Sequence, residues 1–279
     1  MQSSGSAEIA RLEALARVER TPCGEGSVVW HIWGEGRPLL LLHGGSGSWS
    51  HWIRNIPVLA GKGFRVIVPD LPGNGDSASP PDGQDADVLP RWLESGLESL
   101  LGGPSSLDVM AFSFGTLVAT LLAHQYPSRV SRLILVGPPI VPNQSASAVG
   151  IRSWRDQPAG PLRDAIHRHN LAAFMLEHPA SIDDLALRVH AKNVERDRLT
   201  KRRLTQTSLM HDTIITLAQP IDMIAGECDV LYRGKHERLE QALKTIPALR
   251  SFTWLEGAGH WVPFESAERF NQRALELLL

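Results

Sequence analysis

The sequence predicts an α/β protein with a mostly parallel, doubly wound sheet into which a helical segment is inserted. Short apolar runs of strand length alternate with stretches of helical pattern through most of the 279 residues, as in sheets whose strands are joined by crossover helices. The alternation stops between residues 141 and 212, where helical, charge-rich sequence replaces the strands. We therefore expect two parts of a core, residues 1–140 and 213–279, and between them a helical lid of residues 141–212.

The composition indicates a globular protein that acts on a small molecule. Apolar residues make up 43%, charged residues 21%, and the formal net charge is −2, which does not favour nucleic acid or an anionic membrane as partner. No apolar run could span a bilayer, no secretory signal is visible, and two cysteines indicate neither a disulfide framework nor a zinc site. We expect a cytoplasmic protein without a cofactor. Its N-terminal helix, residues 7–18, could pack on the body of the protein or form a homo-oligomer.

The expected strands are apolar runs bounded by turn residues. In the first part of the core they cover residues 27–33, 38–42, 64–69, 107–112 and 130–136. The expected helices between them cover residues 52–59, 88–101 and 116–126. After the lid, two strands alternate with two helices, at residues 221–225, 236–244, 251–255 and 265–278. Continuous apolar strands of this kind are typical of a parallel sheet that is buried on both faces.

One step between a strand and a helix carries the best candidate for a nucleophile. Ser113 stands at this step, with the small residues Ala111 and Gly115 two positions away on either side. A chain that leaves a strand and enters a helix so quickly must turn sharply, and the turn brings flanking backbone close to its neighbours. Such a turn projects Ser113 at the head of the helix, where free N–H groups and the helix dipole favour a developing anion. A serine that only caps the helix is the alternative interpretation.

A serine nucleophile needs a base within hydrogen-bond reach and an acid that orients the base. His260 is the best candidate for the base, because it follows the last expected strand in a glycine-rich turn, whereas His124 and His236 lie in expected helices. Asp229 is the best candidate for the acid, because it comes directly after the preceding strand, with Glu227 as the alternative. Both positions lie where parallel strands end.

The oxyanion of a tetrahedral intermediate needs N–H donors. The amide of Phe114, which follows the candidate nucleophile, is one expected donor, and we assign the other to Gly45 in the turn after the strand 38–42. Gly44 of the same turn is expected to lie against the substrate. The glycines match neither a P-loop nor a complete dinucleotide-binding loop, so the sequence implies no cofactor.

These features together resemble the α/β-hydrolase superfamily over nearly the whole chain, from about residue 26 to the end. The chain order Ser113, Asp229, His260 is the order of that superfamily, and residues 70–77 resemble its loop after the third common strand. A serine at position 113, where haloalkane dehalogenases and epoxide hydrolases have aspartate, tells against those branches. The resemblance implies an α/β-hydrolase fold with a lid and a serine nucleophile.

Within the superfamily, several segments resemble the meta-cleavage-product hydrolases, which cleave carbon–carbon bonds in vinylogous 1,5-diketones. These segments are residues 49–56, residues 182–193 of the lid, and the pair His260-Trp261. The resemblance implies that Arg188 binds an acidic group of the substrate and that Trp261 belongs to the substrate site.

Two positions depart from the pattern of those enzymes. Phe112 and His51 stand where they usually have asparagine, and both are expected to line a more apolar substrate site. The sequence therefore predicts a serine hydrolase that cleaves a small acyl compound, either a carboxylic ester or a carbon–carbon bond of a diketone-like substrate. An acyltransferase or perhydrolase with the same triad, and a non-catalytic small-molecule receptor, are the alternatives.

Overall fold

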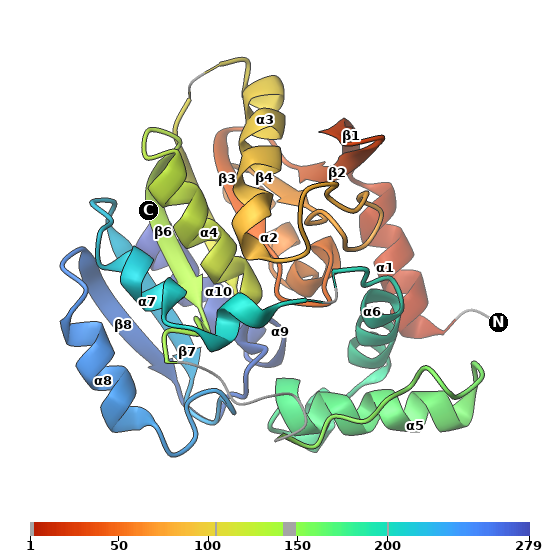
Figure 1. Ribbon diagram of the computed structural model, residues 1–279. Helices are drawn as coiled ribbons and strands as arrows, with labels where there is room; N and C mark the ends of the chain where they lie inside the picture. The colour runs from red at the N-terminus through yellow and green to blue at the C-terminus, as the bar shows by residue number, and fades with distance from the viewer. Residues whose placement is uncertain (1–2, 104, 142–148, 200) are drawn as a thin grey trace.

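A single eight-stranded sheet organises the computed structural model, which describes residues 3–103, 105–141, 149–199 and 201–279 (Figure 1). The strands are β1 (Arg17–Cys23), β2 (Gly26–Trp33), β3 (Arg37–Leu42), β4 (Phe64–Pro69), β5 (Leu107–Phe112), β6 (Val130–Val136), β7 (Ile221–Gly226) and β8 (Leu249–Leu255). Their order across the sheet is β1-β2-β4-β3-β5-β6-β7-β8. The pairs β1–β2 and β2–β4 are antiparallel, and all pairs from β4 to β8 are parallel.

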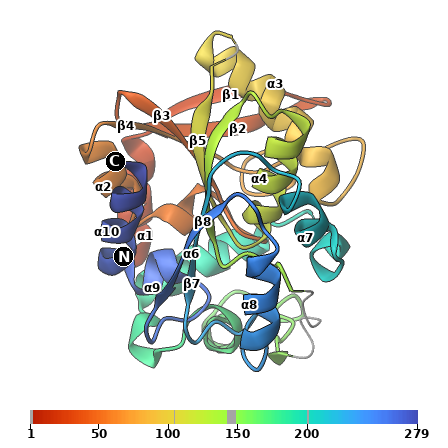
Figure 2. The ribbon, with the colours of Figure 1, turned by 90° about the vertical axis from the view of Figure 1, so that its left-hand side faces the viewer.

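Helices cover both faces of this sheet (Figure 2). The core helices are α1 (Ser4–Ala14), α2 (Ile56–Gly61), α3 (Leu89–Leu101), α4 (Phe114–Gln125), α8 (His236–Lys244), α9 (Val262–Glu265) and α10 (Ala267–Leu278). Alternate residues of the central strands enter two separate apolar layers: Leu40 belongs to the layer that contains residues of α3, α4 and α8, whereas Leu39 belongs to the layer that contains residues of α1, α2 and α10. This alternation is the period of two that a strand imposes on its side chains. The predicted doubly wound α/β sheet is confirmed.

The seven predicted strands agree with the structure to within two residues at each end. The agreement follows from burial, because the central strands β5 and β7 are buried along their whole length. The predicted helix 52–59 begins too early, since residues Trp49–Trp52 form a 3₁₀ turn and α2 starts at Ile56.

The N-terminal prediction is partly wrong. The helix ends at Ala14, and residues predicted to continue it belong to β1, an edge strand that the sequence did not reveal. In β1 only Thr21 and Cys23 are buried, so the strand carries no clear apolar alternation. Helix α1 itself packs on the core, where the indole N–H of Trp33 donates to the carbonyl of Leu12 at 2.9 Å, and on the lid segment, where the backbone N–H of Gly5 donates to Asp184 at 2.7 Å.

Between β6 and β7 the structure has α5 (Pro161–Asn170), a π-helical turn (Leu171–Met175), α6 (Asp184–Glu195) and α7 (Leu209–Ile214). Further 3₁₀ turns of the chain cover Ala86–Val88, Pro179–Ser181 and Arg203–Gln206. Residues 149–199 and 201–212 contain no strand, while residues 142–148 and 200 of the predicted lid lie outside the described residues. Helices α5 and α6 lie together to one side of the sheet, whereas α7 packs against α4 (Figure 1). Within the described residues, no helix is long and apolar enough to cross a membrane.

Candidate active site

Ser113 forms the turn between β5 and α4. Its backbone has φ 51° and ψ −120°, and among the described residues only Ser46 shares a positive φ without being glycine. Gly115 explains why small residues surround the serine: a Cβ there would lie 2.5 Å from the carbonyl oxygen of His43. Strained backbone of this kind persists where the surrounding structure holds it, and it is concentrated at functional sites.

Ser113, His260 and Asp229 form one hydrogen-bonded chain. Nε2 of His260 lies 2.8 Å from Oγ of Ser113, and Nδ1 lies 2.8 Å from Oδ2 of Asp229. The side chains of His260 and Asp229 are fully buried, and the backbone N–H of Leu231 donates to Oδ1 of Asp229. An ionised aspartate can only accept, so Nδ1 carries the proton and Nε2 is free to take the serine proton. The three residues meet because each follows the carboxyl end of a parallel strand.

The imidazole of His260 packs against two aromatic rings and one glycine. The ring of Phe112 lies 5.0 Å from it in a tilted arrangement, and the ring of Phe174 lies 5.0 Å away edge-on. Gly137 also lies against the ring, because a Cβ at this position would approach Cε1 to 3.1 Å. These contacts leave His260 little freedom to rotate away from Ser113.

The two amides expected to bind the oxyanion are both available. Phe114 is the first residue of α4, and the first N–H groups of a helix have no acceptor inside the helix. The N–H of Gly45 has no acceptor among the residues that the structure describes. Gly44 is different: its N–H donates to Nδ1 of His51 at 3.2 Å, and its carbonyl accepts from Nδ1 of His43 at 2.7 Å. Gly44 therefore orders the loop through its own backbone.

His51 presents a neutral donor to the site. Because its Nδ1 accepts the Gly44 hydrogen bond, the proton is on Nε2. Burial, followed by the nearby His43, His190 and His260, holds the pKa of His51 well below its usual range. His51 thus stays uncharged at neutral pH and lines the cavity over Ser113.

Trp261 lies behind His51. Its indole N–H donates to the carbonyl of His51 at 3.0 Å, and its ring stacks on Phe264. The side chain is fully buried and does not line the cavity over Ser113. Trp261 was expected to belong to the substrate site, but it lies behind His51, which it supports, and it does not line this cavity.

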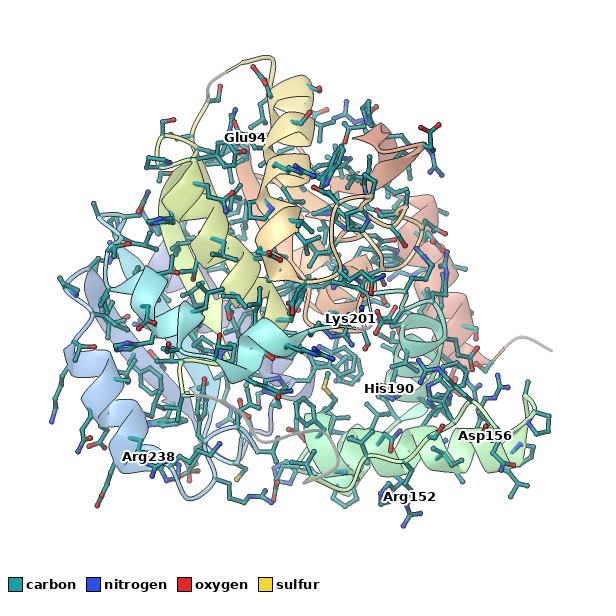
Figure 3. All side chains as sticks on the ribbon, viewed as in Figure 1. Glu94, Arg152, Asp156, His190, Lys201 and Arg238 are labelled. Carbon is teal, nitrogen blue, oxygen red and sulfur yellow. The ribbon has the colours of Figure 1, made fainter. Side chains whose placement is uncertain are left out.

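A cavity of about 840 Å³ opens over Ser113. Its apolar lining comes from both the core and the lid, namely Phe112, Phe114, Pro139, Ile151, Trp154, Phe174, Met175, Val194 and Leu231. Its charged lining is predominantly basic and consists of Arg152, Arg155, Lys201, Arg202, Arg203 and the single acid Asp197. Figure 3 labels His190 and Lys201 between the core and α5, and Arg152 at the outer edge of the molecule beside α5. The sequence missed the basic lining, because these residues lie in irregular segments that have no periodicity.

His190 of α6 is a further imidazole that the sequence did not single out. It lines the cavity, and burial together with the nearby His167 lowers its pKa to about 3. Its Nε2 is buried and has no hydrogen-bond partner among the residues that the structure describes. His190 is therefore a second neutral imidazole on the cavity wall.

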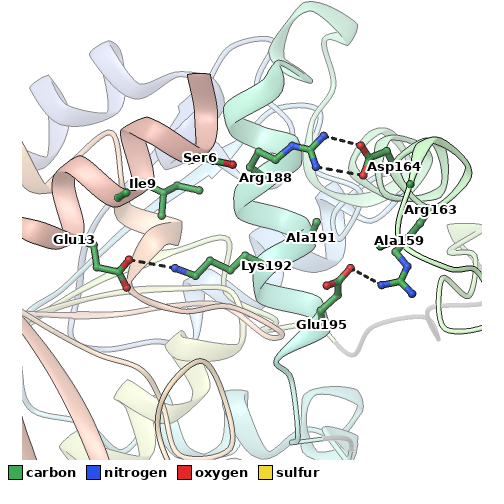
Figure 4. Close-up of a pocket in the computed structure, with 12 residues that line it drawn as sticks. Ser6, Ile9, Glu13, Ala159, Arg163, Asp164, Arg188, Ala191, Lys192 and Glu195 are labelled. Atoms are coloured by element: carbon green, nitrogen blue, oxygen red, sulfur yellow. Dashed lines mark hydrogen bonds and ion pairs between the residues drawn. The ribbon is translucent and has the colours of Figure 1, made fainter. Parts of the chain in front are cut away.

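Arg188 does not lie at this cavity. It pairs with Asp164 at 2.6 Å and with Asp184 at 3.3 Å, and it lines a separate hollow of about 550 Å³ between α1, α5 and α6 (Figure 4). The reason is helical phase: His190, only two residues away and roughly 200° around the helix, faces the active-site cavity instead. Arg188, which was expected to bind an acidic group of the substrate, thus lies on the face of α6 that is turned away from the active-site cavity.

Among the described residues, one group of potential metal ligands lies away from the cavity. Atoms of Glu13, His31 and Asp76 come within 4.8 Å of one another. Lys192 already pairs with Glu13 at 3.3 Å, and Arg196 pairs with Asp76. Because two cations neutralise the two carboxylates, we assign no metal to this group.

The fold and this site define the class of protein. Residues 37–178 match the family model described as alpha/beta hydrolase fold. The chain belongs to this family and is an α/β-hydrolase, as the sequence predicted.

Proteins of similar sequence include hydrolases of one narrower kind. The chain is 27% identical over 260 residues to a 2-hydroxy-6-oxo-6-phenylhexa-2,4-dienoate hydrolase of Burkholderia cepacia, with 88% of each chain covered. It is 29% identical over 257 residues to a 2-hydroxy-6-oxononadienedioate/2-hydroxy-6-oxononatrienedioate hydrolase of Paraburkholderia phymatum, with 86% of each covered. The predicted resemblance to meta-cleavage-product hydrolases is therefore confirmed.

Solved structures share the fold. The carboxylesterase CesB of Bacillus subtilis superposes with a TM-score of 0.80 at 18% identity, over 98% of this chain and 95% of that one. A variant of the meta-cleavage product hydrolase CumD superposes with a TM-score of 0.75 at 23% identity, over 93% and 97% of the two chains. At these identities the likeness concerns the fold alone.

Proposed function

We propose that this protein is a serine hydrolase that cleaves a carbon–carbon bond next to a carbonyl group in an acidic, diketone-like substrate. The hydrogen-bonded chain of Ser113, His260 and Asp229 at the floor of the cavity carries the proposal. The relatives that are named as dienoate hydrolases support the choice of bond.

The proposed reaction begins with attack of Ser113 Oγ on the substrate carbonyl while Nε2 of His260 accepts the serine proton. Asp229 holds the opposite nitrogen protonated and stabilises the imidazolium that forms. The N–H groups of Gly45 and Phe114 donate to the oxyanion. The geometry favours these roles because the acceptor nitrogen already points at the serine oxygen.

The tetrahedral intermediate then collapses. The bond from the carbonyl carbon to the leaving carbon breaks, and that carbon receives the proton held on His260, so an acyl-serine and a neutral fragment result. Such a leaving group must delocalise its electron pair, which a vinylogous carbonyl does. Water then attacks the acyl-serine as His260 removes its proton, and Ser113 is released with the carboxylic acid product.

The basic lining of the cavity supports an acidic substrate. Arg152, Arg155, Lys201 and Arg203 have no carboxylate partner among the described residues, whereas Arg202 is paired with Asp197. Unpaired cations around the mouth of a cavity raise the local concentration of anions and speed their association. We infer that these four side chains, and not Arg188, attract the acidic group of the substrate.

A carboxylic ester is the second candidate substrate. The floor of the cavity around His260 consists of the rings of Phe112 and Phe174, with the neutral His51 beside them. An apolar floor of this kind suits an alkyl or aryl acyl group and needs no conjugated leaving group.

Turnover of two substrates by the wild-type enzyme and Ser113→Ala tests the proposal. The probes are 2-hydroxy-6-oxo-6-phenylhexa-2,4-dienoate and p-nitrophenyl butyrate, both followed by absorbance. We expect higher kcat/KM for the dienoate and loss of both activities in Ser113→Ala, while Ser99→Ala, at an exposed serine of α3, retains them. Turnover that survives in Ser113→Ala would refute the nucleophile, and a preference for the ester would select the second candidate.

Two further measurements address the remaining alternatives. Product analysis with added alcohol or hydrogen peroxide distinguishes hydrolysis from acyl transfer and perhydrolysis, because the acyl-serine is shared by all three. Absence of turnover together with strong thermal protection by the dienoate would instead indicate a receptor.

A further inference from the structure

A partly buried cluster of hydrogen bonds joins the segment after α6 to the loop that carries Gly45. Arg202 donates from one terminal nitrogen to Oδ1 of Asp197 at 3.1 Å, and from the other to Oδ2 at 2.8 Å. The second nitrogen also donates to Oγ of Ser46 at 2.7 Å, and this hydroxyl donates to Oδ2 of Asp197 at 2.6 Å. Three side chains from two distant parts of the chain are thus closed into a ring of hydrogen bonds.

This cluster touches both residues whose amides are proposed for the oxyanion. A Cβ on Gly45 would lie 3.2 Å from Nε of Arg202, so the guanidinium packs directly on that glycine. The same guanidinium lies over the ring of Phe114, 5.8 Å from its centre. Arg202 therefore stands against the backbone of one donor and the side chain of the other.

The backbone of Ser46 connects the cluster to Gly45. Its φ of 50° is in the left-handed region, which a serine rarely adopts. The next residue back along the chain is Gly45, so the backbone conformation at Ser46 sets the direction of the loop that carries the Gly45 N–H. A side chain in such a conformation must be held by its surroundings, and here two hydrogen bonds hold its hydroxyl.

Asp197 is itself fixed to the core. The neighbouring Arg198 donates its backbone N–H to the carbonyl of Gly73 at 2.8 Å, and its guanidinium reaches the carbonyls of Gly75 and Ser77. The side chain of Asp197 is only 7% exposed. The hydrogen bonds among Asp197, Arg202 and Ser46 therefore attach the loop that carries Gly45 to a segment that is itself bound to the core.

We propose that Arg202 is a positioning residue that, through Asp197 and Ser46, holds the Gly45 N–H in place for the oxyanion. The proposal rests on the proposed function of Ser113 and goes beyond it. Its consequence is that loss of the cluster weakens binding of the tetrahedral oxyanion and leaves binding of the uncharged ground state unchanged.

The experiment uses p-nitrophenyl butyrate, a neutral ester that offers no anionic group to Arg202. Arg202→Met and Asp197→Asn should each lower kcat by about ten- to a hundredfold, the range of a lost or displaced oxyanion donor, with KM changed less than twofold. The affinity for phenylboronic acid, which forms a tetrahedral adduct on a serine, should fall in parallel. Arg202→Lys, which keeps one charge but not the fork of donors, should restore part of the activity.

A matched control removes a similar ion pair elsewhere. Arg250 donates from two nitrogens to the buried Asp222 at the amino end of β7, the edge of the sheet opposite Ser113. Arg250→Met should therefore leave kcat and boronate affinity unchanged. Ser46→Ala combined with Arg202→Met should lose no more activity than the larger single loss, because both act through one cluster.

Three outcomes overturn the positioning role. The first is an unchanged kcat in Arg202→Met. The second is a rise in KM that appears only with the anionic dienoate, which would make Arg202 a binder of the substrate anion. The third is an equal loss in Arg250→Met, which would indicate general destabilisation. Failure of the proposed function has a separate signature, no turnover by the wild-type enzyme, and boronate affinity then still compares the variants.

Discussion

Gly137 offers a sharp test of how tightly the triad must be held. It follows β6 with a φ of 56° and lies beside the pair of His260 and Asp229. A Cβ at this position would stand 3.1 Å from Cε1 and 3.2 Å from Nδ1 of His260, and 3.3 Å from Oδ2 of Asp229. Gly137→Ala therefore adds one methyl group against the hydrogen bond between His260 and Asp229.

Two costs can be worked out for Gly137→Ala. A left-handed alanine costs about 1–2 kcal/mol relative to glycine, and each kcal/mol lowers the melting temperature of a chain of this size by about 2–4 °C. The added contacts are also too close, so His260 must move by a few tenths of an ångström. A misplacement of this kind lowers kcat by roughly ten- to a hundredfold, which corresponds to a barrier higher by about 1.4–2.7 kcal/mol.

The assay pairs thermal unfolding with kcat on p-nitrophenyl butyrate. Gly102→Ala is the matched control, because Gly102 has a φ of 72° and a Cβ there would meet nothing within 4 Å. It should lose the same few degrees of melting temperature and keep its kcat. Equal kcat values in the two variants would refute the reasoning that contact with His260, rather than backbone strain, limits catalysis.

Three other predictions follow from the same structure. Asp229→Asn should lower kcat by about 10⁴-fold on either substrate, because the amide donates to Nδ1 of His260 and forces the proton onto the nitrogen that must accept; a loss below tenfold would contradict the assigned tautomer. Burial lowers the pKa of His31 to about 4. Between pH 6.5 and 4 the unfolded chain therefore takes up a proton that the folded chain does not. As the pH falls through this range, the free energy of unfolding should decrease by at most about 3 kcal/mol from this group. In urea titrations His31→Phe should show a shallower fall over that range, and an unchanged slope would contradict the prediction. Arg188→Met should leave KM for the dienoate unchanged and cost about 1 kcal/mol at most, since its ion pair with Asp164 is about one-third exposed; a tenfold rise in KM would return Arg188 to the substrate site.

The sequence alone was sufficient for most of the fold. Central strands such as β5 are buried on both faces, so they appear as continuous apolar runs with visible ends. The edge strand β1 has mostly exposed side chains, and its first residues continue the helical pattern of α1. Its pairing with β2 is a contact between backbones, which leaves little trace in side-chain composition.

The sequence also placed Ser113, Asp229 and His260 together, because each follows the end of a strand and parallel strands end at one edge of the sheet. No such rule governs the lid. Arg188 and Arg202 are both lid-segment arginines, and the sequence favoured the first. Only the packing of α6 against α1 and α5 turns Arg188 away from the cavity, and only an irregular segment anchored on the core brings Arg202 against Gly45. Strand ends follow from local pattern, whereas the direction of a lid side chain depends on contacts between residues far apart in the chain.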